Sequence, residues 1–192
     1  MDIMEILSGL TGNQKVIKQL NKSVGGEPEK VEKAVQIGIP LLMEALNRNT
    51  NNPEGAQSLV KALEKHQDDK VDDLFSFFSN VDTQDGAKML QHIFSNKNEL
   101  VQKNLSKTTG LQQDQIGSLL SRLAPLLLGA LGNQKKAQNL DANGISNLTA
   151  LLSQNLQQSS GGSLFSLATK LLDANKNGSF IDDLFRMLFR KK

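Results

Sequence analysis

Residues 20–46 read LNKSVGGEPEKVEKAVQIGIPLLMEAL, and residues 105–131 read LSKTTGLQQDQIGSLLSRLAPLLLGAL. The two stretches align without a gap at an offset of 85 residues, the separation of Pro40 and Pro125. Shorter matches follow them with small insertions, so the similarity runs through most of the chain. A repeat of this kind predicts one supersecondary unit that is used twice.

The repeat predicts the domain organisation. We expect an all-α protein made of two tandem multi-helix repeats that pack into one helical body, the first over residues 1–80 and the second over residues 81–192. The second copy is the longer one, with a Gly/Ser-containing insertion near residues 157–180. Within the insertion, residues 157–163 (QQSSGGS) are predicted to form a flexible loop.

The spacing of apolar residues predicts the helices. Apolar residues recur at intervals of three and four along nearly the whole chain, as at Ile3, Ile6 and Leu10. This is the period of an amphipathic helix, whereas strands alternate with a period of two. Asn13 and the pair Asn52-Pro53 are typical of helix starts, and Gly25 and Gly110 are typical of helix ends.

Pro40 and Pro125 lie inside the most apolar parts of the two copies. Proline removes one main-chain hydrogen bond and breaks or kinks a helix. We therefore expect a new helix to begin at each proline, over residues 40–48 and 125–132. Both segments are apolar almost all round, which predicts that they are central and fully buried.

Composition and charge exclude several classes of function. The chain has 192 residues, a formal net charge of +2, no cysteine, and no tryptophan or tyrosine. A nucleic-acid-binding protein is therefore not expected, because a clustered basic face and stacking aromatic residues are missing. Disulfides, thiolate metal sites and a cysteine nucleophile are excluded as well.

The location of the protein is predicted from its apolar segments. The N-terminal residues MDIMEILSGLTGNQK are not typical of a signal peptide. The longest apolar run, residues 123–128, is too short to span a bilayer. We expect a cytoplasmic protein without membrane contact. Residues 181–192 (IDDLFRMLFRKK) predict an amphipathic helix that docks on the second copy, with an anionic membrane or a partner groove as the alternatives.

A calcium-like motif lies near the C-terminus. Oxygen-bearing side chains at Asp173, Asn175 and Asn177 precede Gly178, as in the first half of a calcium loop. Asp182 and Asp183 would complete the ligands, but the usual bidentate glutamate at position 12 is replaced by leucine. The alternative is a turn that is followed by a helix start, where aspartates are favoured without metal.

The two histidines are the candidates for acid–base chemistry. Asp68, Asp69 or Asp85 could serve as a partner of His66 or His92. His92 adjoins an apolar pair and is expected to be a partly buried helix residue. No Gly-x-Ser-x-Gly elbow, phosphate-binding loop or dinucleotide fingerprint occurs, so no catalytic residue is assigned and no cofactor other than calcium is considered.

Four local patterns occur in a characteristic order. They are Leu63-x-x-His66 before VDDL, Asp85-Gly86 before ML-x-HIF, Gly110-Leu111 before LAPLLLGAL, and the terminal run from Asp173. Together they resemble the bacterial helical family known as domain of unknown function 937, which is related to YidB-like proteins. The resemblance implies an all-α fold in a bacterial cytoplasmic protein and no established activity. Members often carry aspartates where this chain has Asn175 and Asn177, which argues against calcium.

These observations favour a non-enzymatic helical protein that has a structural or protein-interaction role with an unidentified protein partner. The first alternative is a calcium-binding module that uses residues 173–183. The second alternative is an enzyme that uses His66 or His92. The oligomeric state is left open.

Overall fold

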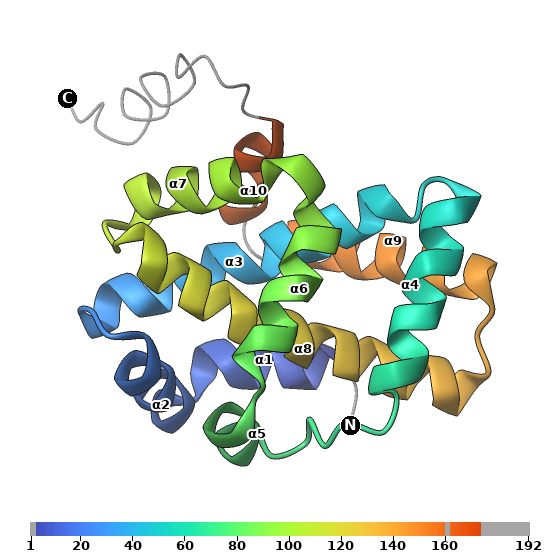
Figure 1. Ribbon diagram of the computed structural model, residues 1–192, viewed down its shortest axis with the longest axis horizontal. Helices are drawn as coiled ribbons and strands as arrows, with labels where there is room; N and C mark the ends of the chain where they lie inside the picture. The colour runs from blue at the N-terminus through green and yellow to red at the C-terminus, as the bar shows by residue number, and fades with distance from the viewer. Residues whose placement is uncertain (1–2, 160–161, 174–192) are drawn as a thin grey trace.

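The computed structural model of the chain describes residues 3–159 and 162–173 (Figure 1). Nearly all of these residues lie in helices, and no strand occurs among them. The predicted all-α fold is therefore confirmed for this part of the chain.

Two long helices form the centre of the protein. Helix α3 (Pro28–Asn49) and helix α8 (Gln113–Gln138) each pack against most of the other helices. They cross at Gly38, where an added Cβ atom would lie 3.3 Å from Leu120 and 3.4 Å from Leu123. The absence of a side chain at Gly38 thus lets the two central helices approach closely.

The remaining helices surround this pair (Figure 1). Helix α6 packs across α8 and also contacts α3, while α4 packs on α8 and α10 on α3. Figure 1 shows α2 and α5 together at one end of the molecule and α7 and α10 at the opposite edge. The bounds are α1 Ile3–Gly12, α2 Gln14–Val24, α4 Pro53–His66, α5 Leu74–Asn80, α6 Thr83–Phe94, η1 Ser95–Lys97, α7 Asn98–Thr109, α9 Ala142–Ser159 and α10 Ser163–Asp173.

A single hydrophobic cluster joins both halves of the sequence. It extends from Ile3 in α1 to Leu172 in α10 and is built of aliphatic residues with a few phenylalanines. The segment 125–132 of α8 is fully buried, as predicted, whereas the segment 40–48 of α3 is buried except for Glu44, Asn47 and Arg48, which are half-buried. The two halves therefore share one core.

The predicted helix ends are confirmed where the structure describes them. The side chain of Asn13 accepts a hydrogen bond from the main-chain N–H of Lys15, and that of Asn52 accepts one from Gly55. Gly25 and Gly110 follow the ends of α2 and α7 with φ angles of 73° and 79°. Such positive φ angles favour glycine because it lacks a Cβ atom.

The predicted helix breaks at Pro40 and Pro125 are wrong. Pro40 lies inside α3 and Pro125 lies inside α8, and each helix continues through its proline. A proline inside a helix costs about 3 kcal/mol because a hydrogen bond is lost and its ring meets the preceding turn. Burial of the surrounding aliphatic residues outweighs this local cost, so tertiary packing decides the outcome.

Gly86 makes room for a main-chain carbonyl group of α8. This carbonyl has no helical hydrogen-bond donor, because Pro125 lacks an N–H group. That group belongs to Ser121, four residues before Pro125. An added Cβ atom on Gly86 would lie 1.8 Å from the carbonyl oxygen of Ser121 and 3.1 Å from the Pro125 ring. Helix α6 therefore crosses α8 at the level of the proline, with main chain against main chain.

The predicted loop at residues 157–163 is wrong at both of its ends, and residues 160–161 lie outside the described residues. Residues 157–159 belong to α9, which ends at Ser159, and α10 begins at Ser163. The Gln-rich sequence continues the helix because glutamine is a good helix former. The apolar segment after the Gly/Ser run forms the helix α10.

Helix α8 is the one helix of the described ranges that is long and apolar enough to cross a membrane, judged by length and composition alone. In this protein, 78% of its most apolar window is buried inside the helical body. A central core helix meets the same criteria, so the burial accounts for its composition.

Candidate functional site

The candidate site lies where the loop after α4 passes over α8. A Cβ atom on Gly129 would lie 2.8 Å from the side chain of Val71 and 3.2 Å from that of Asp69, so the loop rests directly on α8. The side-chain amide of Asn133 donates a hydrogen bond of 3.0 Å to the main-chain carbonyl of Asp69. These contacts hold the loop in one position beside the end of α4.

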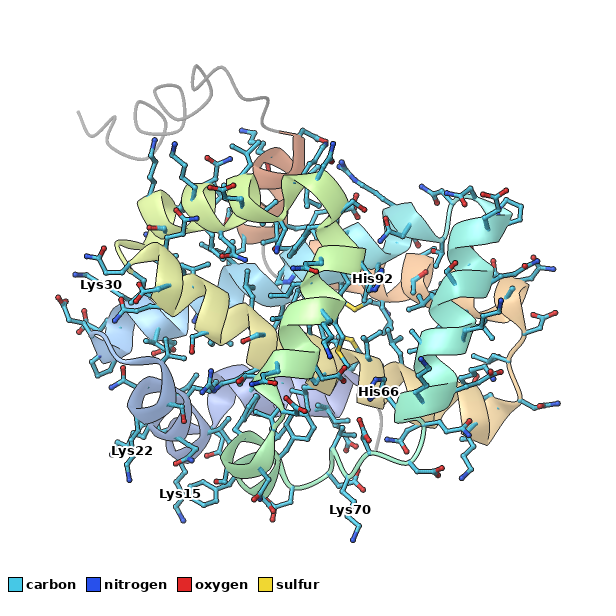
Figure 2. The ribbon with its side chains drawn as sticks, in the orientation of Figure 1. Lys15, Lys22, Lys30, His66, Lys70 and His92 are labelled. Carbon is cyan, nitrogen blue, oxygen red and sulfur yellow. The ribbon has the colours of Figure 1, made fainter. Side chains whose placement is uncertain are left out.

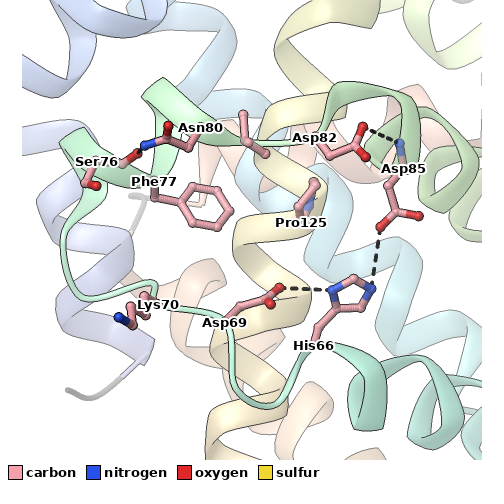
Figure 3. A pocket seen from close by; sticks show the side chains of 10 residues that line it. His66, Asp69, Lys70, Ser76, Phe77, Asn80, Asp82, Asp85 and Pro125 are labelled. Carbon is pink, nitrogen blue, oxygen red and sulfur yellow. Dashed lines mark hydrogen bonds and ion pairs between the residues drawn. The ribbon is translucent and has the colours of Figure 1, made fainter.

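His66, the last residue of α4, stands between two carboxylates (Figure 3). Its Nδ1 donates a hydrogen bond of 2.9 Å to Oδ2 of Asp69, since an ionised carboxylate can only accept. Its Nε2 lies 3.7 Å from Oδ2 of Asp85, at the start of α6. The imidazole thus links the end of α4, the loop and α6, and its side chain is 19% exposed.

A pocket of about 340 Å³ opens beside this histidine. Most of its lining side chains are polar, and Phe77 of α5 and Pro125 of α8 add apolar surface among them (Figure 3). The ring of Pro125 is thus part of the site as well as of the core. The lining residues are His66, Asp69, Lys70, Ser76, Phe77, Asn80, Val81, Asp82, Asp85 and Pro125.

The sequence segment around the pocket is negatively charged, whereas the whole chain has a positive net charge. Residues 67–87 contain six aspartates and one lysine, whereas the whole chain carries a formal charge of +2. The single lysine, Lys70, directs its side chain away from the imidazole in Figure 3. The site therefore presents an acidic surface.

Each of the three pocket aspartates uses one carboxylate oxygen within the protein. Oδ2 of Asp69 accepts from His66, and Oδ2 of Asp85 faces the same ring. Oδ1 of Asp82 accepts two hydrogen bonds from main-chain N–H groups at the start of α6, at 2.9 and 3.1 Å. The second oxygen of each has no hydrogen-bond partner among the described residues, so it is available to a ligand.

The arrangement lacks the hydroxyl group of a catalytic triad. Ser76 lines the pocket, but no serine or threonine of the described residues forms a hydrogen bond with His66. Nε2, the atom that would activate a nucleophile, faces the carboxylate of Asp85. Within the described residues, no hydroxyl group is therefore positioned at His66 as a nucleophile.

The structure selects among the predicted partners of the histidines. Asp69 and Asp85 contact His66, whereas Asp68 forms an ion pair with Lys136 of α8. His92 lies toward the other end of α6 and is exposed, without a hydrogen bond to any described residue (Figure 2). The prediction that His92 is partly buried is therefore wrong, because its ring projects from the outer face of the helix.

Most of the predicted calcium ligands lie outside the described residues: Asn175, Asn177, Asp182 and Asp183. Asp173 is described, and both of its carboxylate oxygens face the guanidinium of Arg48. This hydrogen-bonded arginine lowers the pKa of Asp173, while burial acts in the opposite direction. Within residues 3–159 and 162–173, no three His, Asp or Glu side chains are arranged to hold a metal ion.

Several pocket residues have no counterpart among the sequence predictions. Phe77 and Asn80 lie on the seven-residue helix α5, whose short sequence does not reveal which side faces the loop. Pro125 was predicted as the start of a buried helix, not as part of a pocket. The one sequence signal for this place was the high density of aspartates around His66.

The residues of this site lie within a stretch that matches a known protein family. Residues 5–134, from α1 to near the end of α8, match the family described as "Bacterial protein of unknown function (DUF937)". No curated protein and no solved structure matches the chain. The match includes all residues of the pocket and more than half of the sequence, and it agrees with the family that the short motifs predict. The chain therefore belongs to the bacterial family of unknown function DUF937.

Proposed function

We propose that this protein is a non-enzymatic protein-interaction module, and that the His66 pocket receives a basic side chain of its partner. The observation that carries the proposal is the placement of Asp69, Asp82 and Asp85 around one open pocket, each with a carboxylate oxygen to spare. A lysine or arginine side chain provides the complementary charge and the donors that these oxygens lack.

The apolar side of the pocket supports the same ligand. Lysine and arginine bury their methylene stems on apolar surface while the charged end seeks polar partners. Phe77, Val81 and Pro125 offer such a surface in the same pocket as the carboxylates. His66 contributes by holding Asp69 and by bringing α6 and the loop together.

The expected affinity is modest and depends on salt. The side chains of Asp69 and Asp85 are 37% and 44% exposed, so solvent and ions screen their charge. Specific binding of a protein partner would need further contacts on the surface around the pocket.

The test is an NMR titration of the isotope-labelled full chain with N-acetyl-arginine methylamide at low salt. We expect shift changes that are concentrated in residues 66–86 and that weaken several-fold in Asp85→Asn. Asp72→Asn is the matched control, because Asp72 lies on the same loop but outside this pocket. Absent shifts, or shifts that Asp85→Asn leaves unchanged, would overturn the proposal.

The enzymatic alternative rests on a different observation, the 2.9 Å bond between His66 and Asp69. A carboxylate that orients an imidazole is typical of general-base catalysis. This alternative requires Asp85 to give way to a substrate at Nε2. Hydrolysis of an activated ester, abolished by His66→Gln and faster in Asp85→Asn, would favour it over the binding function.

We also propose that the chain consists of two tandem copies of one helical unit. Both long helices contain a buried proline, and both are preceded by a helix that ends at a glycine of positive φ. A Cβ atom on Gly38 of α3 would lie 3.4 Å from Leu123 of α8, which stands one repeat offset of 85 residues later in the sequence. Contact between equivalent positions is what two related units packed about a pseudo-twofold axis would produce.

A further inference from the structure

A second pocket lies beside the loop that follows α4. It has a volume of about 470 Å³ and is bounded by α1, this loop and α8. Val71 and Asp72 of the loop line it, whereas Asp69 of the same loop lines the His66 pocket. We call it the Asp72 pocket. Its lining residues are Ile6, Val71, Asp72, Ala130, Asn133, Gln134 and Ala137.

The two pockets follow one another along α8. Pro125, Gly129 and Asn133 are spaced at intervals of four, so they lie on one side of the helix. Pro125 lines the His66 pocket, and Asn133 lines the Asp72 pocket. Between them, the loop rests on Gly129 through the side chains of Asp69 and Val71. Eight residues of an α-helix span about 12 Å, which sets the separation of the two pockets.

The Asp72 pocket offers hydrogen-bond acceptors. Asp72 is exposed, and its carboxylate has no hydrogen bond or ion pair with any residue that the structure describes. The amide nitrogen of Asn133 donates to the main-chain carbonyls of Asp69 and Gly129, each at 3.0 Å. Both of its hydrogens are thus used, and Asn133 offers a ligand only Oδ1, which accepts. A basic side chain supplies the charge and the donors that these acceptors lack.

The neighbouring lysines of α8 do not neutralise Asp72. Lys135 pairs with Glu64 at 3.2 Å, and Lys136 pairs with Asp68, so both ammonium groups are engaged with other carboxylates. The aliphatic residues of the lining are Ile6, Val71, Ala130 and Ala137. They provide apolar surface for the methylene stem of a lysine or arginine, as in the His66 pocket.

We infer that the partner presents two basic side chains, one to each pocket, from an extended segment in which they are four residues apart. This inference rests on the proposed function of the His66 pocket and adds the sequence pattern of the partner. Residues of an extended chain rise about 3.3 Å each and alternate between two faces. Residues i and i+4 therefore share a face at about 13 Å, close to the separation of the pockets, whereas i and i+2 span only about 7 Å. Residue i+2 faces the loop between the pockets, so we expect it to be small.

Two pentapeptides of identical composition test the spacing. Acetyl-Arg-Ser-Gly-Ser-Arg-amide carries its arginines four residues apart, and acetyl-Arg-Gly-Arg-Ser-Ser-amide carries them two residues apart. Each is titrated into the isotope-labelled full chain at low salt and followed by NMR. We expect the first peptide to shift residues 66–86 and 130–137 together. It should bind at least about threefold more tightly than the second, because its second contact is intramolecular.

Asp72→Asn tests the second pocket. It should remove the preference for the first peptide and leave the binding of N-acetyl-arginine methylamide at the His66 pocket unchanged. Glu99→Gln is the matched control, because it removes one exposed carboxylate on α7, outside both pockets, and should retain the preference. The NMR spectra verify that both variants are folded.

The outcomes separate this inference from the proposed function. Equal affinities for the two peptides, with binding that still depends on Asp85, would overturn the two-pocket inference and leave the proposed function standing. A preference that survives Asp72→Asn would overturn the inference as well. If neither peptide nor the single arginine binds, both are overturned.

Discussion

Arg48 and Asp173 are 125 residues apart in sequence and form a two-point ion pair between α3 and α10. Nη1 of Arg48 lies 2.5 Å from Oδ1 of Asp173, and Nη2 lies 3.3 Å from Oδ2. Nε of the same arginine donates to Glu44 at 2.8 Å, and Lys97 donates to the carbonyl of Leu172 at 3.0 Å. Two basic side chains thus attach the C-terminal end of α10 to the central body.

This ion pair predicts how acid affects stability. Because Arg48 lowers the pKa of Asp173, the carboxylate stabilises the folded state above its unfolded pKa of about 3.9, and this stabilisation is lost as pH falls through the folded pKa. The side chain is 56% exposed, so the effect stays below about 1 kcal/mol. Urea unfolding between pH 2 and pH 7 should show a smaller acid-dependent loss in Asp173→Asn than in the natural chain. Asp72→Asn should retain the full loss.

Glu44 should matter more for stability than a surface acid. Its Oε1 accepts from Arg48 and its Oε2 accepts from the Ser153 hydroxyl at 2.8 Å, and the side chain is 13% exposed. Glu44→Ala leaves both donors without this acceptor, which should cost about 1–3 kcal/mol in the free energy of unfolding. Glu64→Ala removes a more exposed partner of Lys135 and should cost less than about 1 kcal/mol. Equal losses in the two variants would contradict the role of the Glu44 network.

Gly86→Ala should destabilise the crossing of α6 and α8. The new Cβ atom would meet the main-chain carbonyl of Ser121, which cannot move without shifting α8. We expect a loss of at least about 2 kcal/mol, which exceeds the gain of about 1 kcal/mol from helix propensity. Gly12→Ala is the control, because a Cβ atom there meets nothing within 4 Å. Chemical unfolding of both variants checks this prediction, and a stable Gly86→Ala protein would show that the crossing can adjust.

Calcium titration by calorimetry distinguishes the binding module from the calcium alternative. We expect no saturable heat up to millimolar calcium. The carboxylate of Asp173 already pairs with Arg48. The next two oxygen-bearing positions of the loop, Asn175 and Asn177, are neutral amides. Saturable binding that Asp173→Ala abolishes would contradict this expectation and would identify residues 173–183 as a metal site.

The sequence predicted the kind of fold well because local signals agreed with packing. The spacing of apolar residues, the caps at Asn13 and Asn52, and the glycines at Gly25 and Gly110 all act within a few residues, and the structure confirms them. Pro40 and Pro125 were misjudged because their local cost is offset by long-range burial, which periodicity does not reveal.

The site was less predictable for the same reason. Asp69 is three residues from His66, so the spacing alone made it a candidate partner. Asp85 reaches His66 only because α6 crosses α8 at Gly86 and Pro125, and the apolar side of the pocket depends on the same crossing. Neither feature can be derived from residues that are close in sequence.

The packing of α10 on α3 has a consequence for the nascent chain. Helix α3 is complete at residue 49, but the helix that covers its flank ends at residue 173. While the ribosome synthesises the segment between them, the apolar side of α3 that α10 covers in the folded protein stays exposed. Contacts this far apart slow folding and leave apolar surface open to chaperones in the meantime. A chain released before α10 is synthesised would be a substrate for quality control rather than a smaller working protein.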